Sequence, residues 1–159
     1  VGYIDYSTLP VNKLSSEDKI LLKNIDFQQE IPEETMLSCD TFWIREAFKN
    51  LLKNAVEHTQ KNGQIRMMLD ILNGQYDIRI YNSGAEIRMD QREEIFDRFY
   101  QTDSGKKDNF GIGLHLSREI FRMHQGTVRV LESNETGTTF QILLPVFVAK
   151  DVGSNLTEL

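Results

Sequence analysis

The spacing of apolar residues along the chain predicts an alternation of helices and strands. Apolar residues recur three or four positions apart between Asp40 and Lys61, which predicts an amphipathic helix that Asp40 caps and Gly63 ends. Shorter helices are expected at 15–24, 89–99 and 111–125. Alternating apolar and polar residues predict strands elsewhere. These strands are 25–32, 35–39, 64–72, 75–81, 127–133 and 138–146.

Two turns between neighbouring strands indicate the fold class. Asn73-Gly74 is the dipeptide most typical of a two-residue hairpin, so the strands that flank it should pair antiparallel. A turn at 134–137 predicts a second hairpin. The order of the elements favours an α+β fold, a two-layer sandwich in which a mixed, mostly antiparallel sheet is covered on one face by about three helices.

Composition indicates one folded domain and limits the partners that bulk charge could hold. The chain has 159 residues, of which 40% are hydrophobic and 26% charged, enough to form its own core. A net charge of −6 argues against a nucleic acid or an anionic membrane held by bulk electrostatics, and we expect neither as a partner. The lone cysteine, Cys39, cannot form an internal disulfide and is expected to be a small buried hydrophobe.

Four polar residues share one side of the helix predicted between Asp40 and Lys61. They fall at i, i+4, i+7 and i+8, while the apolar stripe faces the sheet. These residues are Asn50, Asn54, Glu57 and His58. Two amide oxygens one turn apart can share a hard cation such as Mg²⁺, which takes few protein ligands beside phosphate and water oxygens. For the asparagine pair alone, a solvated helix face is the simpler interpretation.

Five segments in a fixed order carry a family resemblance. They are 48–59 (FKNLLKNAVEHT), 81–87 (YNSGAEI), 93–100 (EEIFDRFY), 110–120 (FGIGLHLSREI) and 137–145 (GTTFQILLP). In this order they resemble the N box, first glycine box, phenylalanine box, second glycine box and closing strand of the ATP-binding domain of bacterial sensor histidine kinases. The resemblance covers about residues 25–145. It implies the Bergerat fold of the GHKL (HATPase) superfamily, shared with DNA gyrase, mismatch-repair ATPases and a heat-shock chaperone.

The resemblance implies a site for ATP and Mg²⁺. Asn50 and Asn54 match the metal ligands, and His58 stands where relatives often place an aromatic ring against adenine. The backbone N–H groups at Gly111 and Gly113 open a helix, a position that favours an anion such as a triphosphate. The residues expected to contact the nucleotide are Asn50, Asn54, His58, Asn82, Gly84, Ile87, Phe99, Lys106, Lys107, Gly111, Ile112, Gly113 and Leu114. Lys106 and Lys107 lie in an expected mobile loop, 101–110, where they either reach the phosphates or stay solvated.

Three positions depart from the family pattern. Glu57 replaces a common basic residue and is not expected to bind phosphate, and Gln101 replaces a common phosphate-binding Arg. Asn82 replaces the usual Asp of the first glycine box. Its amide oxygen can accept a hydrogen bond from the adenine amino group and its NH₂ can donate to a ring nitrogen, although a plain turn after a strand is the alternative. Phe96 and Phe99, three residues apart, are expected to pack in the core.

Asn50 also bears on the reaction type. In hydrolytic relatives a Glu at this position activates water, whereas an amide cannot accept a proton at neutral pH. Transfer of the γ-phosphoryl group to a histidine is therefore expected instead of hydrolysis. No Asp or Glu directly follows His58, His115 or His124, as a phosphoacceptor motif requires, so the acceptor histidine should lie on a separate dimerisation domain.

The resemblance implies a wider protein around this domain. Residues 1–24 would be a linker from the dimerisation domain, 25–146 the ATP-binding catalytic domain and 147–159 a C-terminal tail. The expected partners are ATP or ADP, the upstream dimerisation domain and a response regulator. The domain would be the cytoplasmic part of a membrane-anchored bacterial sensor and would not touch the membrane itself. Three alternatives stay open: a hydrolytic GHKL ATPase, a degenerate nucleotide sensor without catalysis, and a pure interaction domain.

Overall fold

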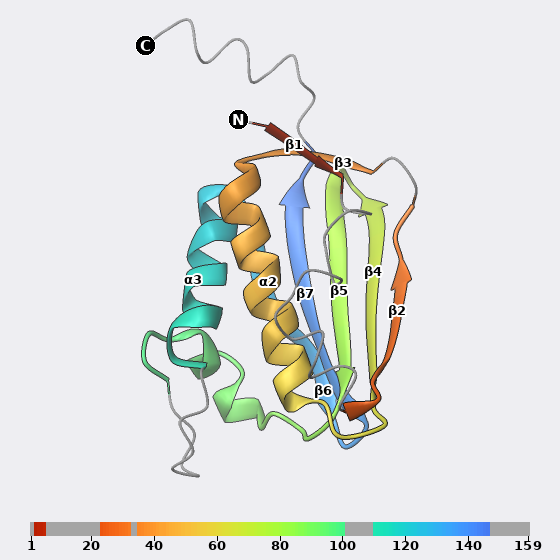
Figure 1. The fold of residues 1–159 in the computed structure, drawn as a ribbon. Coiled ribbons are helices and arrows are strands. Elements are labelled where there is room, and N and C mark those ends of the chain that lie inside the picture. The colour runs from red at the N-terminus through yellow and green to blue at the C-terminus, as the bar shows by residue number, and fades with distance from the viewer. Residues whose placement is uncertain (1, 6–22, 33–34, 101–109, 147–159) are drawn as a thin grey trace, which may run out of the picture.

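One sheet and two long helices make up most of the fold (Figure 1). The computed structural model describes residues 2–5, 23–32, 35–100 and 110–146. The strands are β1 (Gly2–Asp5), β2 (Asp26–Glu30), β3 (Met36–Cys39), β4 (Gln64–Leu72), β5 (Gln75–Ser83), β6 (Thr127–Asn134) and β7 (Gly137–Pro145). The helices are α2 (Thr41–His58) and α3 (Phe110–Met123), together with two short 3₁₀ helices, η3 (Met89–Gln91) and η4 (Glu94–Phe96). In these ranges, no helix is both long and apolar enough to cross a membrane.

The main sheet has five strands in the order β2-β4-β5-β7-β6. The β2–β4 pair is parallel and the other three pairs are antiparallel. In Figure 1, α2 and α3 lie along one face of this sheet. The predicted two-layer α+β sandwich with a mixed, mostly antiparallel sheet is therefore confirmed. β1 pairs antiparallel with β3 in a separate two-stranded sheet.

The hairpin predicted from Asn73-Gly74 joins β4 to β5. Both residues have positive φ angles, 51° and 72°, as a two-residue hairpin turn requires. A Cβ added at Gly74 would meet open space, so the backbone conformation and not crowding favours glycine there. The register that follows from this turn places Asn82 opposite Ile65, at the far end of β5 from the hairpin.

The helix predicted from Asp40 begins as expected and ends early. The Asp40 carboxylate accepts a hydrogen bond from the Trp43 N–H at 3.2 Å, which caps α2. Beyond His58 the backbone of Thr59 is extended, and its hydroxyl donates to the Ala55 carbonyl at 2.6 Å. These bonds end the helix before Lys61, the predicted end.

Other predicted elements differ from the structure or fall outside it. The helix predicted at 89–99 is wrong, because η3 and η4 occupy this range without side-chain caps and the backbone is extended at Asp97. The range 1–24, predicted to be a linker, contains β1, which pairs with β3. Most of the predicted helix 15–24, residues 101–109 of the predicted loop and the tail 147–159 lie outside the described residues.

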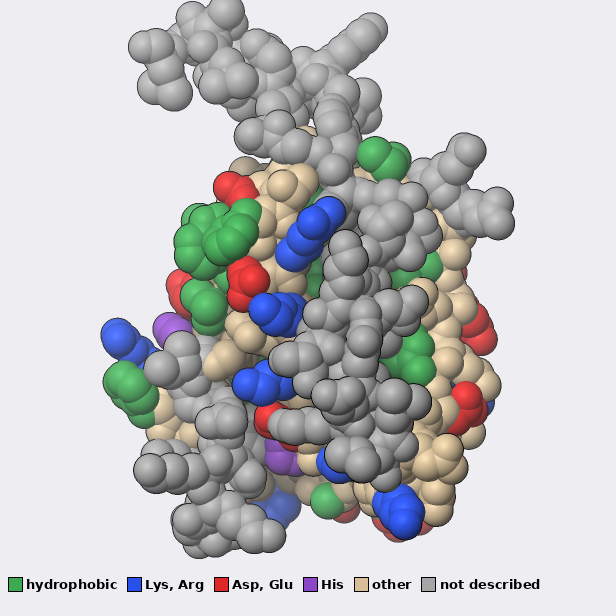
Figure 2. All heavy atoms as spheres, viewed as in Figure 1, with side chains coloured by type: hydrophobic (Ala, Val, Ile, Leu, Met, Phe, Trp, Pro, Cys, Tyr) green, Lys and Arg blue, Asp and Glu red, His purple; other side chains and the backbone are tan. Residues whose placement is uncertain are grey.

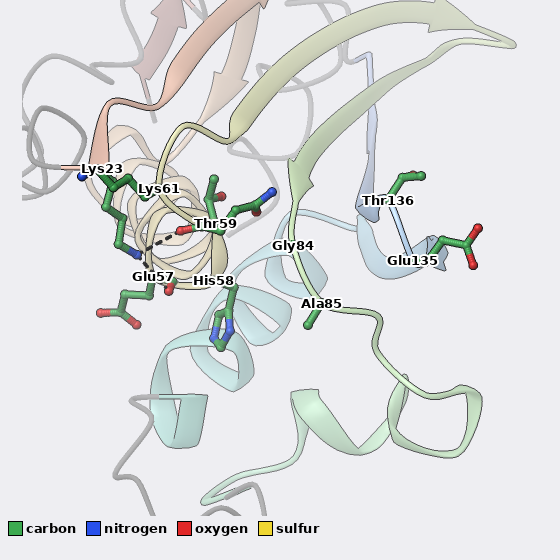
Figure 3. Close-up of a pocket in the computed structure, with 10 residues that line it drawn as sticks. Lys23, Glu57, His58, Thr59, Lys61, Gly84, Ala85, Glu135 and Thr136 are labelled. Atoms are coloured by element: carbon green, nitrogen blue, oxygen red, sulfur yellow. Dashed lines mark hydrogen bonds between the residues drawn. The ribbon is translucent and has the colours of Figure 1, made fainter.

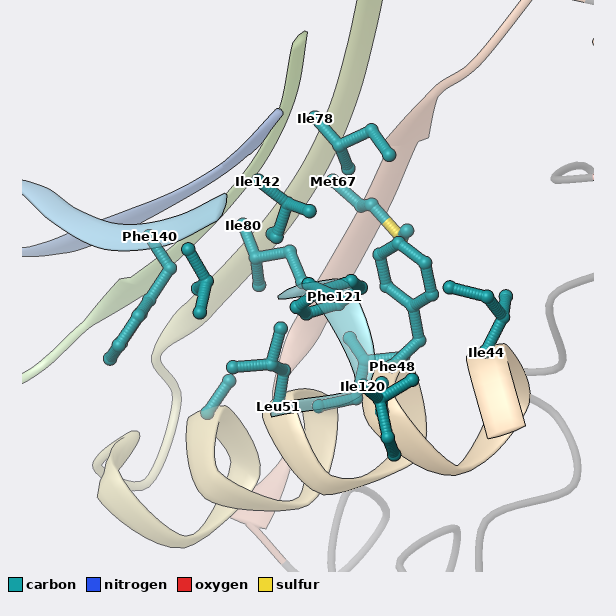
Figure 4. Close-up of a cluster of buried hydrophobic side chains, with 14 of the residues drawn as sticks. Ile44, Phe48, Leu51, Met67, Ile78, Ile80, Ile120, Phe121, Phe140 and Ile142 are labelled. Atoms are coloured by element: carbon teal, nitrogen blue, oxygen red, sulfur yellow. The ribbon is translucent and has the colours of Figure 1, made fainter. Parts of the chain in front are cut away.

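The hydrophobic core lies between the sheet and the two helices (Figure 4). Phe48 of α2 meets Phe121 of α3 edge to face, with ring centroids 5.3 Å apart. Both rings are almost fully buried against apolar side chains of the sheet. In Figure 4 these include Met67, Ile78, Ile80, Phe140 and Ile142. Burying each such side chain contributes about 1.5–3 kcal/mol, so this packing fixes the helices over the sheet.

Hydrogen bonds also tie the two helices to each other. The buried Ser117 hydroxyl donates to the Ala47 carbonyl at 2.9 Å. His124 follows α3, and its Nε2 accepts from the Asp40 N–H at 3.0 Å while its Nδ1 donates to the Ile120 carbonyl at 2.8 Å. Both bonds together need the neutral imidazole with its proton on Nδ1. The C-terminal end of α3 is thus fixed to the N-terminal end of α2.

The exposed side of α2 is basic although the chain is acidic overall. Arg45, Lys49 and Lys53 follow one another at intervals of four residues and are exposed. Figure 2 shows Lys and Arg side chains following one another down this face of the molecule. The net charge of −6 is therefore not spread evenly over the surface.

Cys39 is buried at the end of β3, as predicted for a small hydrophobe. Its exposed fraction is 2%. Burial, together with the nearby charge of Asp40, raises the pKa of the thiol to about 11. The thiol is therefore protonated, and poorly nucleophilic, at neutral pH.

A buried carboxylate, Asp77, lies on the face of the sheet away from the helices, because its neighbour Ile78 points into the core. Arg79 donates to Asp77 through Nε and Nη2 at 3.2 and 3.1 Å, and Gln141 Nε2 donates at 3.2 Å. Gln141 in turn accepts from Arg129 Nε at 2.8 Å. The hydrogen bonds from Arg79 and Gln141, with the positive charge of Arg79, hold the pKa of Asp77 below its usual value.

Asp77→Asn should lower the free energy of unfolding by about 1–2 kcal/mol at pH 7, because charge-assisted hydrogen bonds are lost. A carboxyl group whose pKa is depressed by folding stabilises the protein above its unfolded pKa of about 3.9 and loses that effect as the pH falls further. The difference between wild type and variant should therefore shrink below about pH 4. Urea unfolding at a series of pH values measures it, with the exposed Asp90→Asn as control. A difference that does not change with pH would contradict the role of the Asp77 charge.

Candidate functional site

The candidate site lies where the second half of α2 meets the first turn of α3 and the loop after β5. Asn50 is half-buried on α2 and faces the start of α3. A Cβ added at Gly113 would lie 3.7 Å from the Asn50 Cβ and 3.9 Å from the Asn50 Oδ1. The predicted N box and second glycine box, far apart in the sequence, are therefore adjacent in the fold.

Asn54 lies one turn after Asn50 and is buried, with an exposed fraction of 9%. A solvated helix face, the simpler interpretation of the pair, is therefore wrong for Asn54. Among the described residues, no hydrogen bond reaches its side-chain amide. In the described part of the chain, the only fully enclosed side-chain nitrogen or oxygen without a partner is Arg118 Nε, so the Asn54 amide keeps a small contact with solvent through which a ligand could reach it.

The chemistry of this pair fits Mg²⁺. The described part of the chain holds no group of three or more His, Cys, Asp or Glu side chains that could bind a metal ion. A cation at Asn50 and Asn54 would therefore be bound by amide oxygens and completed by phosphate or water oxygens. Mg²⁺ prefers this oxygen environment and commonly takes only one or two ligands from the protein.

Asn82 and Gly84 lie where β5 runs into the loop. Asn82 is 4% exposed and points to the same face of the sheet as Ile80 of the core. Its Nδ2 donates to the Ser83 carbonyl at 3.2 Å, and among the described residues Oδ1 accepts no hydrogen bond. Gly84 has a φ of 151°, and a Cβ there would overlap the His58 carbonyl oxygen. Glycine is thus needed for the loop to pass directly against the end of α2.

A pocket of about 580 Å³ adjoins this point (Figure 3). It is lined by Lys23, Glu57, His58, Thr59, Gln60, Lys61, Gly84, Ala85, Glu135 and Thr136. In Figure 3, Gly84 and Ala85 lie between His58 and the β6–β7 turn. Two of the predicted contact residues, His58 and Gly84, line the pocket, whereas Asn54 and Asn82 do not.

Lys23 fixes the helix end that carries His58. Its Nζ donates to the carbonyls of Val56, Glu57 and Thr59 at 2.9, 3.2 and 3.1 Å. A cation at the C-terminus of a helix satisfies free carbonyls and interacts favourably with the helix dipole. Sequence reasoning missed this contact, because Lys23 precedes these carbonyls by more than 30 residues.

The two phenylalanines of the phenylalanine box differ. Phe96 is 1% exposed and meets Phe140 edge to face with centroids 6.0 Å apart, so its predicted core position is confirmed. The His115 Nδ1 donates to the Phe96 carbonyl at 3.2 Å and holds this segment against α3. Core packing of Phe99 is wrong, because its side chain is 62% exposed. It has a positive φ of 65°, an unusual conformation for an aromatic residue, and the Arg98 guanidinium lies 4.9 Å from its ring centroid.

The second glycine box opens α3 as predicted. The helix begins at Phe110, so the backbones of Gly111 and Ile112 lie in its first turn. The Leu114 side chain is 1% exposed in the core, which leaves only its backbone to face a ligand. Lys106, Lys107 and Gln101 lie outside the described residues.

The residues that anchor Ile87 were missed by the sequence analysis. The Ile87 N–H donates to the Ser133 hydroxyl at 2.8 Å, and its carbonyl accepts from Arg92 Nε at 3.2 Å. Ser133 lies on β6, far along the chain, so no local pattern links it to Ile87. In the sequence, Ser133 is marked only as a polar residue at the end of a predicted strand.

A family model and curated proteins match this chain. The model is described as "Histidine kinase-, DNA gyrase B-, and HSP90-like ATPase" and matches residues 39–147. Sensor protein kinase WalK of Staphylococcus epidermidis is 29% identical over 154 residues, which cover 93% of this chain and 25% of the relative. Heme sensor protein HssS of Staphylococcus aureus is 34% identical over 102 residues, which cover 64% of this chain and 22% of the relative. The chain therefore spans about a quarter of the length of these relatives.

Solved structures share the fold. The catalytic domain of histidine kinase ThkA, in a nucleotide-free form, matches with a TM-score of 0.78 and 27% identity over 91% of this chain and 94% of that chain. ThkA in complex with the response regulator protein TrrA matches with a TM-score of 0.75 and 27% identity over 92% of this chain and 42% of that chain.

Proposed function

This chain belongs to the family of histidine kinase-, DNA gyrase B- and HSP90-like ATPases, and we propose on that basis that it is the ATP-binding catalytic domain of a bacterial sensor histidine kinase. It transfers the γ-phosphoryl group of ATP to a histidine on a separate dimerisation domain. WalK and HssS, to which it is similar, are named as sensor proteins, which supports this choice within the family.

The observation that carries the proposed reaction is the amide of Asn50. It faces the first turn of α3, where the triphosphate would bind, and it cannot take a proton from water at neutral pH. Glu46, one turn earlier on α2, pairs with Lys49 at 3.7 Å and lies a further turn from the site. An imidazole acceptor needs no such base, because it brings its own nucleophilic nitrogen, and positioning then supplies most of the catalysis.

The nucleotide would bind with its base near the end of α2 and its phosphates at α3. The imidazole of His58 would stack on adenine, and the free Oδ1 of Asn82 would accept from its amino group. The N–H groups of the first turn of α3, around Gly111 and Gly113, would hold the phosphates. When bound, Mg²⁺ neutralises phosphate charge.

The remaining proposed contacts flank this core of the site. Ile87 would line the base pocket, and Phe99 would cover the bound nucleotide from the exposed side. Lys106 and Lys107 would contribute positive charge toward the phosphates. They would take over the role of the phosphate-binding Arg that relatives often have at the position of Gln101. Asn50 and Asn54 would hold Mg²⁺ through their amide oxygens.

The wider assignment follows from relatives that are longer than this chain. We propose that residues 1–24 lead from a dimerisation domain that carries the acceptor histidine, and that a response regulator is the second protein partner. ThkA, a similar kinase, has been solved in complex with a response regulator, which supports that partner. The domain would lie in the cytoplasm, as part of a membrane-anchored sensor.

Calorimetry with ATP and ADP in the presence of Mg²⁺, followed by phosphate release and labelling assays, tests the proposal. The chain should bind both nucleotides, release little phosphate, and label a histidine on a dimerisation domain supplied in trans. Hydrolysis at about one turnover per second or faster would instead indicate a hydrolytic ATPase. Binding without any labelling would favour a nucleotide sensor that lacks catalysis. The departures from the family pattern at Glu57, Asn82 and Gln101 are the reason to test for this alternative.

A further inference from the structure

A closed ring of hydrogen bonds holds the loop that follows β5. Ile87 is bound at both backbone groups by side chains from outside its own turn: its N–H donates to the Ser133 Oγ at 2.8 Å and its carbonyl accepts from Arg92 Nε at 3.2 Å. Arg92 also donates from Nη2 to the Ser133 carbonyl at 2.8 Å. Arg92, Ile87 and Ser133 are therefore each bonded to the other two.

This ring is anchored in the sheet. Ser133 is 5% exposed, and its Oγ lies 2.7 Å from the Oγ1 of Thr138, which is also buried. Thr138 is the cross-strand neighbour of Asn82 in the β5–β7 pair. A continuous set of contacts thus runs from Arg92 through Ser133 and Thr138 to the strand position of Asn82.

Arg92 is suited to this role by its geometry and by the absence of a competing anion. Its planar guanidinium presents donors at fixed angles, so two of them can reach two carbonyls from different segments. In the part of the chain that the structure describes, no carboxylate pairs with Arg92, and both of its hydrogen bonds go to backbone carbonyls. Arg88, on the same loop, bonds instead to Asp90 at 3.3 Å and is exposed.

We propose that Arg92 is a positioning residue for the nucleotide site: by holding Ile87 to Ser133, it fixes the loop against the base-binding side of the site. This inference rests on the proposed function, because Ile87 and Asn82 are base contacts only if the chain binds an adenine nucleotide. Arg92 does not touch the nucleotide itself. Its loss should therefore weaken binding of the base, and should change neither binding of the phosphates nor the rate of phosphoryl transfer.

Arg92→Ala should weaken the binding of ATP and ADP by the same factor, about tenfold, since two hydrogen bonds to a charged donor are lost and the loop is released. The KM for ATP should rise by a similar factor, while kcat at saturating ATP should stay within about twofold. Arg92→Lys, which keeps the charge but not the planar fork, should lie in between. Arg88→Ala, the matched loss of a positive charge from the same loop, should bind ATP and ADP like the wild type.

Amide hydrogen exchange of the nucleotide-free protein gives a second measurement that needs no ligand. The Ile87 N–H should exchange faster in Arg92→Ala than in the wild type or Arg88→Ala. Unchanged affinity for both nucleotides, an equal loss in Arg88→Ala, or a loss confined to kcat would overturn the proposal. If the wild type binds no nucleotide, the proposed function is contradicted. If the wild type binds nucleotide and Arg92→Ala binds it with the same affinity, only this inference is contradicted. Thermal melting checks folding, and Arg92→Lys decides the case should the alanine variant fail to fold.

Discussion

Asn54→Ala should lower the affinity for ATP in the presence of Mg²⁺ about a hundredfold, equivalent to about 2.7 kcal/mol, and should leave the free energy of unfolding nearly unchanged. The loss of affinity is expected because the amide oxygen would be a metal ligand. The stability is expected to hold because no hydrogen bond from the described residues reaches the amide, so its removal breaks no polar contact within the fold.

Calorimetry with ATP in Mg²⁺ and in EDTA, together with urea unfolding, separates these two effects. Without the metal, variant and wild type should bind ATP almost equally. Lys53→Ala, at the neighbouring exposed position of α2, serves as the control and should change neither quantity appreciably. Unchanged affinity in Mg²⁺ would show that Asn54 is not a ligand. A large loss of stability would show that its amide has a structural partner.

Asn82→Ala should weaken ATP binding about ten- to a hundredfold, because the adenine amino group would lose its acceptor in a buried place. Selectivity should fall as well. Guanine carries a carbonyl where adenine carries its amino group, so the wild type should reject GTP and the alanine variant should discriminate less. Competition binding with ATP and GTP measures both effects.

Asn82→Asp is the matched variant. It keeps an acceptor for the adenine amino group, so ATP binding should be retained. Its second oxygen would face the Ser83 carbonyl in place of the Nδ2 donor, so its free energy of unfolding should fall below that of the wild type. If Asn82→Ala binds ATP as tightly as the wild type and rejects GTP equally, Asn82 is only a residue of the turn and adenine is recognised elsewhere.

Elements with a local cause were predictable from the sequence. The Asn73-Gly74 turn and the Asp40 cap are set by neighbouring residues, and both are present. β1 was missed because four residues without a sustained period become a strand only through pairing with β3, a contact between distant segments. The segment 89–99 has the composition of an α-helix, yet it forms only two 3₁₀ helices of three residues each, η3 and η4.

The candidate site divides in the same way. The motif spacing identified Asn50 and Gly113, and the fold brings them together. The resemblance could not foresee that Phe99 is exposed, since its conformation depends on a positive φ and on Arg98. It also could not foresee Arg92 or Lys23, because both act on backbone carbonyls of distant residues, and carbonyls leave no signature in a sequence.

The buried thiol of Cys39 can report how often the fold opens around β3. Because the thiol is 2% exposed and its pKa is about 11, an alkylating reagent at neutral pH reacts with it only in molecules where β3 has separated from the core. The sequence contains no other cysteine, so every modified molecule records one such event. A nucleotide that binds only molecules in which β3 is packed on the core would reduce the open population and slow the modification, so the rate of alkylation would then report ligand binding independently of catalysis.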